Sequence, residues 1–255
     1  MIDIHAHILP GLDDGAQTLE EAVRLANAAC EDGIVAVVAT PHADGTFGRR
    51  LGYTEQRLTE LRQAFLASGL KLEVMPGCEA LLTPEIAARA AAGQYLTLNG
   101  SRYLLVEWPI YQLPTYVHQA LFELRLKGFV PVLAHAERYQ AVQTDVNMLV
   151  TLVERGALVQ VTSGSLLGEF GPEAQRTAEI MLEHGLAHAL ASDVHSAIHR
   201  PPLLSAGATR ATRLIGSDAA RALVVDTPRA IVEDQPIELP SPRPYRRRPF
   251  WAFWR

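Results

Sequence analysis

Two histidines stand two residues apart at the end of the short apolar run that begins the sequence. Ile2 and Ile4 alternate with other residues as in a buried strand, so the rings of His5 and His7 would project from one face of it. Two imidazoles on one face are typical of a metal site. An Asp-Asp-Gly loop follows at 13–15, where a carboxylate can turn back toward the same point. Ordinary polar residues at a strand end would look the same, so this peptide alone leaves both interpretations open.

Histidine and acidic residues also end most of the later apolar runs. They are His42, Glu79, Glu107, His135, Asp193 and His195. Taken singly, each could satisfy a backbone group or cap a helix. Side chains at the carboxyl ends of barrel strands converge on one face, however, and with His5, His7 and Asp14 they would bring five imidazoles and four carboxylates together. Such carboxylates repel one another unless cations lie between them, and mixed nitrogen and oxygen ligands suit two or three ions of Mn²⁺, Fe²⁺ or Zn²⁺.

Apolar strands that alternate with helices would position these residues. Besides the N-terminal strand, we expect strands at 34–40, 72–79, 103–107, 130–135, 158–161 and 187–195. Helices are expected at 19–33, 54–68, 83–93, 115–127, 145–155, 173–184, 205–214, 217–224 and 227–232. This alternation favours an α/β fold with right-handed crossovers, as a seven-stranded relative of the eight-stranded TIM barrel. A doubly wound open sheet is the alternative, but the first strand-to-helix turn lacks the Gly-x-Gly-x-x-Gly nucleotide fingerprint.

Length and composition are those of a soluble globular protein. The chain has 255 residues, 48% of them hydrophobic and 20% charged, which fits one large domain or two small ones. Cys30 and Cys78 form no disulfide framework, so a reducing compartment is the simplest fit. Neither a secretory signal nor an apolar stretch of membrane-spanning length is present. We therefore expect a cytoplasmic protein, and nothing in the sequence indicates its oligomeric state.

The composition changes near residue 237. We expect a barrel domain at 1–236 and a flexible arm at 237–255, where prolines forbid a regular helix. Five arginines and no acid lie within 243–255, although the net charge of the chain is −5, so the body is more acidic than the total suggests. Such a body is a poor partner for nucleic acid. The basic and aromatic arm would suit peripheral contact with the anionic inner face of a membrane or with an acidic partner, and a tail with no dedicated partner is an equal alternative.

The order of these motifs resembles that of a known family. The matching segments are His5-x-His7, Thr40-Pro41-His42, Gly77-Cys78-Glu79, Val106-Glu107, Ala134-His135-x-Glu137-Arg138-Tyr139 and Ala191-Ser192-Asp193-x-His195. They are similar to the polymerase and histidinol phosphatase (PHP) superfamily. Within it, the opening His-Ala-His-Ile-Leu-Pro-Gly-Leu-Asp-Asp-Gly and the segment 134–139 resemble the CpsB/YwqE type of metal-dependent bacterial tyrosine-protein phosphatases from capsular and exopolysaccharide operons.

The resemblance, which spans about residues 1–200, implies a distorted barrel that holds three divalent ions, often manganese. One ion would be bound by His5, His7, Glu79 and Asp193, a second by Glu79, Glu107 and His135, and a third by Asp14, His42 and His195. Arg138 and Arg200 match arginines that grip the substrate phosphate, although both could be plain surface charge, Arg200 more readily than Arg138.

Such a site suits the hydrolysis of phosphate monoesters without a covalent intermediate. A water that bridges two cations is deprotonated near neutral pH and can attack phosphorus in line, while metals and arginines neutralise the charge. The thiol route of a Cys-x5-Arg loop is excluded, because Ala36 and Pro84 stand where its arginine would follow Cys30 and Cys78. The sequence does not decide which group gives a proton to the leaving phenolate, and His42 and His195 are the candidates.

Two departures from the family pattern bear on the substrate. The family tends to carry Gln-Ile-Asn or Gln-Leu-Asn in its sixth strand, whereas this chain has Gln160-Val161-Thr162, although Ser165-Leu166-x-Gly168 remains. The loop 43–53, with three glycines and two arginines, would border the site, and its divergence leaves the substrate preference open.

The favoured hypothesis is a protein-tyrosine phosphatase that acts on a bacterial tyrosine kinase controlling polysaccharide synthesis. A small-molecule phosphatase, such as one for histidinol phosphate, is the first alternative. An open, shallow site would favour a protein tail, and a closed pocket the metabolite. A metal-binding regulatory subunit without turnover is the second alternative, but a pure scaffold has no reason to keep an open coordination position.

Overall fold

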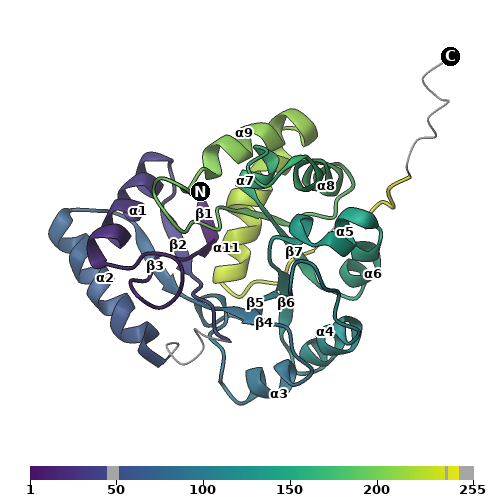
Figure 1. Cartoon of the computed structure of the whole chain (residues 1–255), viewed down its shortest axis with the longest axis horizontal. Helices are drawn as coiled ribbons and strands as arrows, with labels where there is room; N and C mark the ends of the chain where they lie inside the picture. The colour runs from purple at the N-terminus through teal and green to yellow at the C-terminus, as the bar shows by residue number, and fades with distance from the viewer. Residues whose placement is uncertain (45–51, 239–240, 247–255) are drawn as a thin grey trace.

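The computed structural model describes residues 1–44, 52–238 and 241–246. Short strands lie in the middle, and helices surround them (Figure 1). The strands are β1 (Ile2–Ala6), β2 (Ala36–Ala39), β3 (Glu73–Pro76), β4 (Glu79–Leu81), β5 (Tyr103–Glu107), β6 (Val130–Leu133), β7 (Leu158–Thr162) and β8 (Ala189–Ala191). The α-helices are α1 (Leu19–Glu31), α2 (Thr54–Ser68), α3 (Ile86–Ala91), α4 (Val117–Leu126), α5 (Gln140–Thr144), α6 (Met148–Glu154), α7 (Ser163–Leu166), α8 (Pro172–Glu183), α9 (Leu204–Ile215), α10 (Ser217–Arg221) and α11 (Thr227–Val232). Short 3-10 turns occupy η2 (Leu98–Gly100) and η3 (Ala136–Arg138), and η4 (Ala222–Asp226) is a π-helical turn.

All the paired strands run parallel and follow one another in chain order. One sheet contains β1, β2 and β3, and the other contains β4 to β8. Their strand pairs are all parallel, and helices lie between most strands along the chain. The α/β class predicted from the sequence is confirmed.

The predicted number of seven strands is not confirmed, because the described residues contain eight strands in two sheets. The strand expected at 72–79 is interrupted after Pro76, and β4 begins only at Glu79. At this break the chain passes tightly over β2, since a Cβ on Gly77 would lie 2.7 Å from Val38 Cγ1. Single parallel bridges, His42 with Glu79 and Ala6 with Val194, connect the edges of the two sheets.

Alternate residues of the strands pack into two separate apolar cores. The inner core is formed mainly by strand residues and by one residue of α11: Ile2, Ile4, Val38, Leu105, Val132 and Ile231 are among its members. The outer core packs the opposite strand faces, such as Val37, Leu104 and Val159, against the surrounding helices. Because both strand faces are buried, the strands read as continuous apolar runs rather than as alternating ones.

Local sequence explains most helix boundaries. The Thr18 side chain accepts a hydrogen bond from Glu21 N and caps α1. The helix expected at 145–155 begins later, at Met148, because Asp145 is extended and ends the separate helix α5. The helix expected at 217–224 is α-helical only to Arg221 and then continues as the π-helical turn.

The described part of the C-terminal arm lies against the body of the molecule. Arg243 N donates to the His184 carbonyl oxygen, and Tyr245 exchanges two hydrogen bonds with the Asn147 side chain. The other arm residues singled out from the sequence, Arg247, Arg248, Arg255 and the aromatic residues among 250–254, fall outside the described residues, as do 45–51 of the loop 43–53. None of the described helices is both long and apolar enough to cross a membrane.

Candidate metal centre

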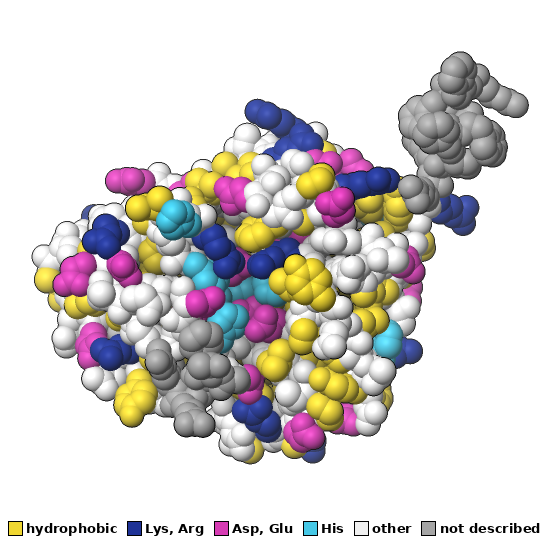
Figure 2. Space-filling model, in the orientation of Figure 1, with side chains coloured by type: hydrophobic (Ala, Val, Ile, Leu, Met, Phe, Trp, Pro, Cys, Tyr) yellow, Lys and Arg dark blue, Asp and Glu magenta, His cyan; other side chains and the backbone are white. Residues whose placement is uncertain are grey.

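The residues predicted to carry the chemistry lie at or just beyond the carboxyl ends of the strands, with Glu79 opening β4 directly after β3. Ion pairs and hydrogen bonds connect these residues: His5, His7, Asp14, His42, Glu79, Glu107, His135, Asp193 and His195. Figure 2 shows histidine and acidic side chains gathered in a hollow near the middle of this face, with basic side chains along one edge. We call these nine residues the metal centre.

His5 and His7 both direct Nε2 toward the middle of the centre. The Nδ1 proton of His5 is donated to Gln160 Oε1 at 3.0 Å, and that of His7 to Asp13 Oδ2 at 2.6 Å. In this tautomer each Nε2 carries a lone pair, and the two Nε2 atoms are only 3.1 Å apart. Two lone pairs cannot face each other at this distance without a proton or a metal ion between them.

Two buried carboxylates stand beside this histidine pair. Glu79 Oε2 is 3.3 Å from His5 Nε2 and 3.4 Å from His7 Nε2, and Asp193 Oδ1 is 3.4 Å from His5 Nε2. Burial opposes a charge on His5, but the carboxylates of Glu79 and Asp193 outweigh it and raise the pKa of His5 to about 9. Burial likewise opposes ionisation of Glu79, yet His5 and His135 hold its pKa well below the usual value. The field of the site therefore strongly favours a bound cation.

A second group of ligand atoms lies on the other side of Glu79. His42 Nδ1 is 3.2 Å from Glu79 Oε2 and 3.1 Å from Glu107 Oε1. His135 Nε2 is 3.0 Å from Glu79 Oε1 and 3.7 Å from Glu107 Oε2. Glu79 thus lies between the first group, formed by His5, His7 and Asp193, and this second group.

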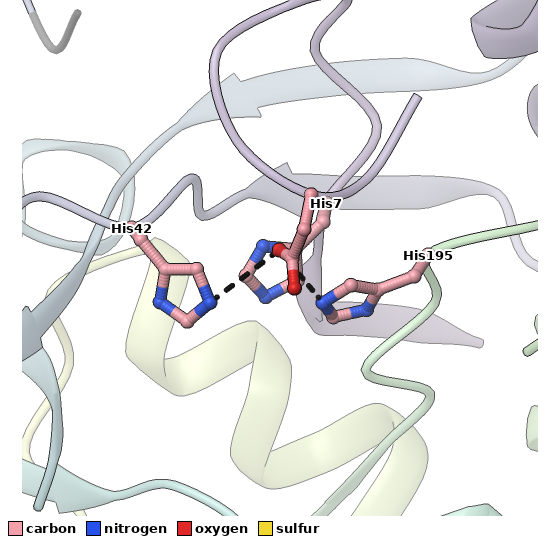
Figure 3. Close-up of side chains that lie close together, drawn as sticks. His7, His42 and His195 are labelled. Atoms are coloured by element: carbon pink, nitrogen blue, oxygen red, sulfur yellow. Dashed lines mark ion pairs between the residues drawn. The ribbon is translucent and has the colours of Figure 1, made fainter. Parts of the chain in front are cut away.

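A third group forms around Asp14, at the rim. Asp14 Oδ1 lies 3.6 Å from His42 Nε2 and 3.3 Å from His195 Nε2. Figure 3 shows His42 and His195 approaching from opposite sides, with His7 behind them. His195 donates its Nδ1 proton to the Asp193 carbonyl oxygen, so its Nε2 is also free to face this group. The neighbouring imidazoles, His195 above all, lower the pKa of Asp14 despite its partial burial.

Two residues of the centre adopt the left-handed backbone conformation, which is costly for residues other than glycine. They are His135 with φ of 35° and Asp193 with φ of 54°. Hydrogen bonds hold both in place, from His135 N to Gln160 Oε1 and from Asp193 N to the His5 carbonyl oxygen. Strain of this kind is typical of functional sites.

Both predicted phosphate-binding arginines reach the centre. Arg138 Nη1 donates to Asp193 Oδ2 at 2.9 Å, and Arg200 Nη2 donates to the same oxygen. Their side chains are 18% and 29% exposed, so both remain partly accessible from solvent.

The donor set fits divalent metal ions. Three sets of ligand atoms each lie close enough to hold one ion: His5, His7 and Asp193; His42, Glu79 and Glu107; and His7, Asp14, His42 and His195. These sets differ from the expected ones in three ways: Glu79 is not in the first, His42 takes the place of His135 in the second, and His7 joins the third. The buried His135 Nδ1 has no hydrogen-bond partner within the described residues.

The sequence reading missed two supporting residues, Asp13 and Gln160. Both fix histidine tautomers, and Gln160 Oε1 also accepts from His135 N. A signal for Gln160 was present, because it is the one polar residue amid the apolar run Leu158–Val161.

Comparison with known proteins identifies relatives along most of the chain. The family described as "Capsular polysaccharide synthesis, CpsB/CapC" matches residues 1–233. The tyrosine-protein phosphatase YwqE of Bacillus subtilis is 38% identical over 197 residues, which cover 77% of this chain and 78% of that protein. The putative tyrosine-protein phosphatase CapC of Staphylococcus aureus is 36% identical over 205 residues, or 80% of each chain. A solved structure from work on YwqE of Bacillus subtilis and CpsB of Streptococcus pneumoniae, described as metal-dependent tyrosine phosphatases, has a TM-score of 0.93 and 33% identity, and covers 97% of this chain and 100% of that one.

Proposed function

This chain belongs to the capsular polysaccharide synthesis CpsB/CapC family, and from that premise we propose that it dephosphorylates a bacterial tyrosine kinase that controls capsular or exopolysaccharide synthesis. The resemblance predicted from the motifs is confirmed, and the chain is a metal-dependent protein-tyrosine phosphatase. The observation that carries the proposal is the pair of imidazole Nε2 atoms 3.1 Å apart among buried carboxylates.

We propose that the metal centre holds three divalent cations, with manganese as the physiological metal. His5, His7, Glu79 and Asp193 would hold the first, Glu79, Glu107 and His135 the second, and Asp14, His42 and His195 the third. The short distances between the ligand atoms support each set. The approach of His42 to Glu79 and Glu107 allows it to serve the second ion instead.

When bound, the cations lower the pKa of coordinated water and neutralise charge on the phosphoryl group. The residues of the chain orient the substrate and supply protons. Arg138 and Arg200 carry donors that can turn from Asp193 to phosphate oxygens. His42 and His195 lie near the rim and are the candidates for protonating the leaving phenolate.

A thiol nucleophile has no support in the structure. Burial raises the pKa of the Cys78 thiol to about 12, and burial also raises the pKa of Cys30. Because the thiolate is the nucleophilic form, neither cysteine is suited to attack phosphorus. This favours direct attack by water over a covalent phosphoenzyme.

Exposed apolar side chains in the loops at this face favour a protein substrate over a metabolite. Tyr111, which follows β5, is 82% exposed, and Ile198, which follows β8, is 83% exposed. A groove bordered by Asp14, His195 and Ile198 continues to Glu21 and Arg24 of α1. Residues that flank a phosphotyrosine could contact these loops, whereas a small metabolite would gain nothing from them.

We also propose that the two sheets act as one distorted barrel, in which β3 and β4 together take the place of one strand. The bridges at both sheet edges and the inner apolar core support this. We further propose that the barrel domain ends at residue 236. We also propose that the protein lies at the inner face of the membrane and that the arm contacts anionic lipid there.

The decisive experiment is a metal-supplemented phosphatase assay on the wild type and His135→Ala. Three substrates are compared: a phosphotyrosine peptide, histidinol phosphate and a generic aryl phosphate. We expect Mn²⁺-dependent hydrolysis of the peptide, its abolition by a chelator, and a loss of at least about a hundredfold in His135→Ala. Preference for histidinol phosphate would contradict the protein substrate, and activity that survives the chelator would contradict the metal mechanism.

A further inference from the structure

The structure brings the Phe170 ring to both phosphate-binding arginines. The Arg138 Cζ atom lies 4.4 Å from the centroid of this ring, and the Arg200 Cζ atom lies 5.6 Å from it. Both distances are within the range in which a guanidinium is attracted to the electron-rich face of an aromatic ring. One side chain thus contacts two cations that reach the site from different segments, η3 and the loop after β8.

The two arginines need such a support because they carry like charges in the same place. Both donate to one oxygen of Asp193, and that carboxylate also stands beside His5, at 3.4 Å. An Asp193 engaged by a cation has less charge left to hold two guanidinium groups together. A neutral aromatic ring can keep both groups in position without competing for the cation.

The loop that carries Phe170 is built to hold the ring still. It is the turn between α7 and α8, and it follows directly on Ser165 and Leu166 at the end of α7. Gly168 and Gly171 have φ of 88° and 89°, and Glu169 N donates to the Gly164 carbonyl oxygen at 2.9 Å. One edge of the ring lies close to Gly164, where a Cβ would be 3.1 Å from Phe170 Cε2 and 2.4 Å from Glu169 Oε2.

We infer that Phe170 is a positioning residue that aligns Arg138 and Arg200 for the phosphoryl group of the substrate. This inference rests on the proposed function and adds to it a residue that contacts neither metal nor phosphate. When phosphate arrives, the arginine donors turn from Asp193 to the phosphate oxygens while the guanidinium planes stay against the ring. The ring thereby restricts both arginine side chains before phosphate arrives, so less conformational entropy is lost on binding.

The test compares Phe170→Leu, which keeps apolar volume without an aromatic face, with Phe170→Trp, which restores the face. With Mn²⁺-loaded protein, we expect Phe170→Leu to weaken binding of inorganic phosphate, measured by calorimetry, by about fivefold to tenfold. The KM for an aryl phosphate should rise by a similar factor with a smaller change in kcat, because the arginines hold phosphate in both the ground state and the transition state. Phe170→Trp should recover most of the loss. Phe122→Leu, the same change at an exposed position of α4, should change nothing.

A second measurement does not depend on turnover or metal. In metal-free protein, the Nε–H resonance of Arg138 should show a ring-current shift that disappears in Phe170→Leu and returns in Phe170→Trp. Unchanged phosphate binding and unchanged arginine resonances in Phe170→Leu would overturn the inference, and so would a loss that Phe170→Trp fails to restore. A wild type that binds phosphate but does not hydrolyse phosphotyrosine would instead contradict the proposed function alone.

Discussion

At the level of single residues, the centre depends on which nitrogen of each histidine is free. Gln160, Asp13 and the Asp193 carbonyl oxygen each accept a hydrogen bond from the Nδ1–H of one histidine. The Nε2 atom of each ring then faces inward. Sequence reasoning located the histidines, because strand ends can be predicted from apolar runs. Their hydrogen-bond partners come from other strands and loops, so three-dimensional packing decides which residues they are, and only Gln160 stands out in the sequence, as the one polar residue of its apolar run.

Gln160→Leu tests this support directly. The change keeps the volume of the side chain but removes the oxygen that accepts from His5 Nδ1 and His135 N. We expect Mn²⁺ affinity, measured by calorimetry, to fall by about tenfold to a hundredfold, as is usual when a partner of a metal-binding histidine is lost. Gln119→Leu on the exposed face of α4 is the matched control and should bind metal like the wild type. Equal affinity in the two variants would show that Gln160 has no such role.

His188 predicts a pH dependence of stability that is separate from the metal centre. It is 5% exposed, its Nδ1 accepts from Val159 N, and burial lowers its pKa to about 4. The folded state keeps this imidazole neutral, whereas the unfolded chain takes up a proton below its ordinary pKa of about 6.5. Stability from this group is therefore complete above about pH 6.5 and is lost as the pH falls toward 4, by up to about 3 kcal/mol.

Urea unfolding of the metal-free wild type and of His188→Asn between pH 7 and pH 4 measures this effect. The other titrating groups contribute equally to the stability of both proteins, so the difference reports on His188. His188→Asn keeps an acceptor for Val159 N but cannot be protonated. Its free energy of unfolding should fall less steeply with acid than that of the wild type. Parallel pH profiles would contradict the assignment.

At the level of elements, the loop after β1 is the segment that completes the centre. It returns to the end of β1, where Ala16 N donates to the His7 carbonyl oxygen at 3.1 Å. The sequence predicted that Gly15 permits a turn, but it could not reveal how close this return would be. A Cβ at position 15 would lie 2.0 Å from the same carbonyl oxygen, a distance that no side chain can adopt.

Gly15→Ala should therefore displace the loop together with Asp13 and Asp14. We expect a loss of about 3 kcal/mol in the free energy of unfolding, measured with urea, and weaker metal binding, because a backbone atom must move. Gly52→Ala is the control, since a Cβ there meets none of the described residues within 4 Å, and its stability should change by less than about 0.5 kcal/mol. A Gly15→Ala protein as stable as this control would refute the close return.

The division into two sheets was also beyond the sequence. Residues 72–79 are long enough for one strand, and the break falls at Pro76-Gly77, where the chain passes close to Val38. By contrast, the alternation of strands and helices was predictable, because most strand residues are buried and most helices lie next to a glycine, a proline or a capping residue. Local patterns of this kind identify elements, and contacts between distant segments decide how the elements join.

At the level of the whole molecule, the described part of the arm is anchored by its backbone and by one guanidinium, since the Arg243 side chain donates to the Glu183 carbonyl oxygen. Asn147 pairs with the N–H and carbonyl of Tyr245, and His184 does the same for Arg243. None of these residues belongs to the metal centre. The flexible arm expected from composition therefore includes a segment, 241–246, that contacts the body at several points.

Deleting residues 240–255 should lower stability slightly and leave chemistry intact. The lost hydrogen bonds are expected to cost about 2 kcal/mol, or about 4 °C in Tm, measured by calorimetry. The kcat and KM for a small aryl phosphate should not change, while binding to anionic vesicles or to the kinase should weaken. Asn147→Ala, which keeps the arm but loses two of its bonds, should show part of the Tm change and none of the binding change. A large loss of turnover in the deletion variant would contradict this division of roles.

The left-handed backbone of His135 and Asp193 has a consequence for engineering this protein. Each residue costs the fold on the order of 1 kcal/mol, and glycine, which would relieve that cost, offers no imidazole or carboxylate. Selection for heat resistance alone would favour such replacements and would yield robust but inactive variants. Selection that also demands hydrolysis should instead find its stabilising substitutions in the surrounding helices. Activity and heat tolerance would then depend on different residues.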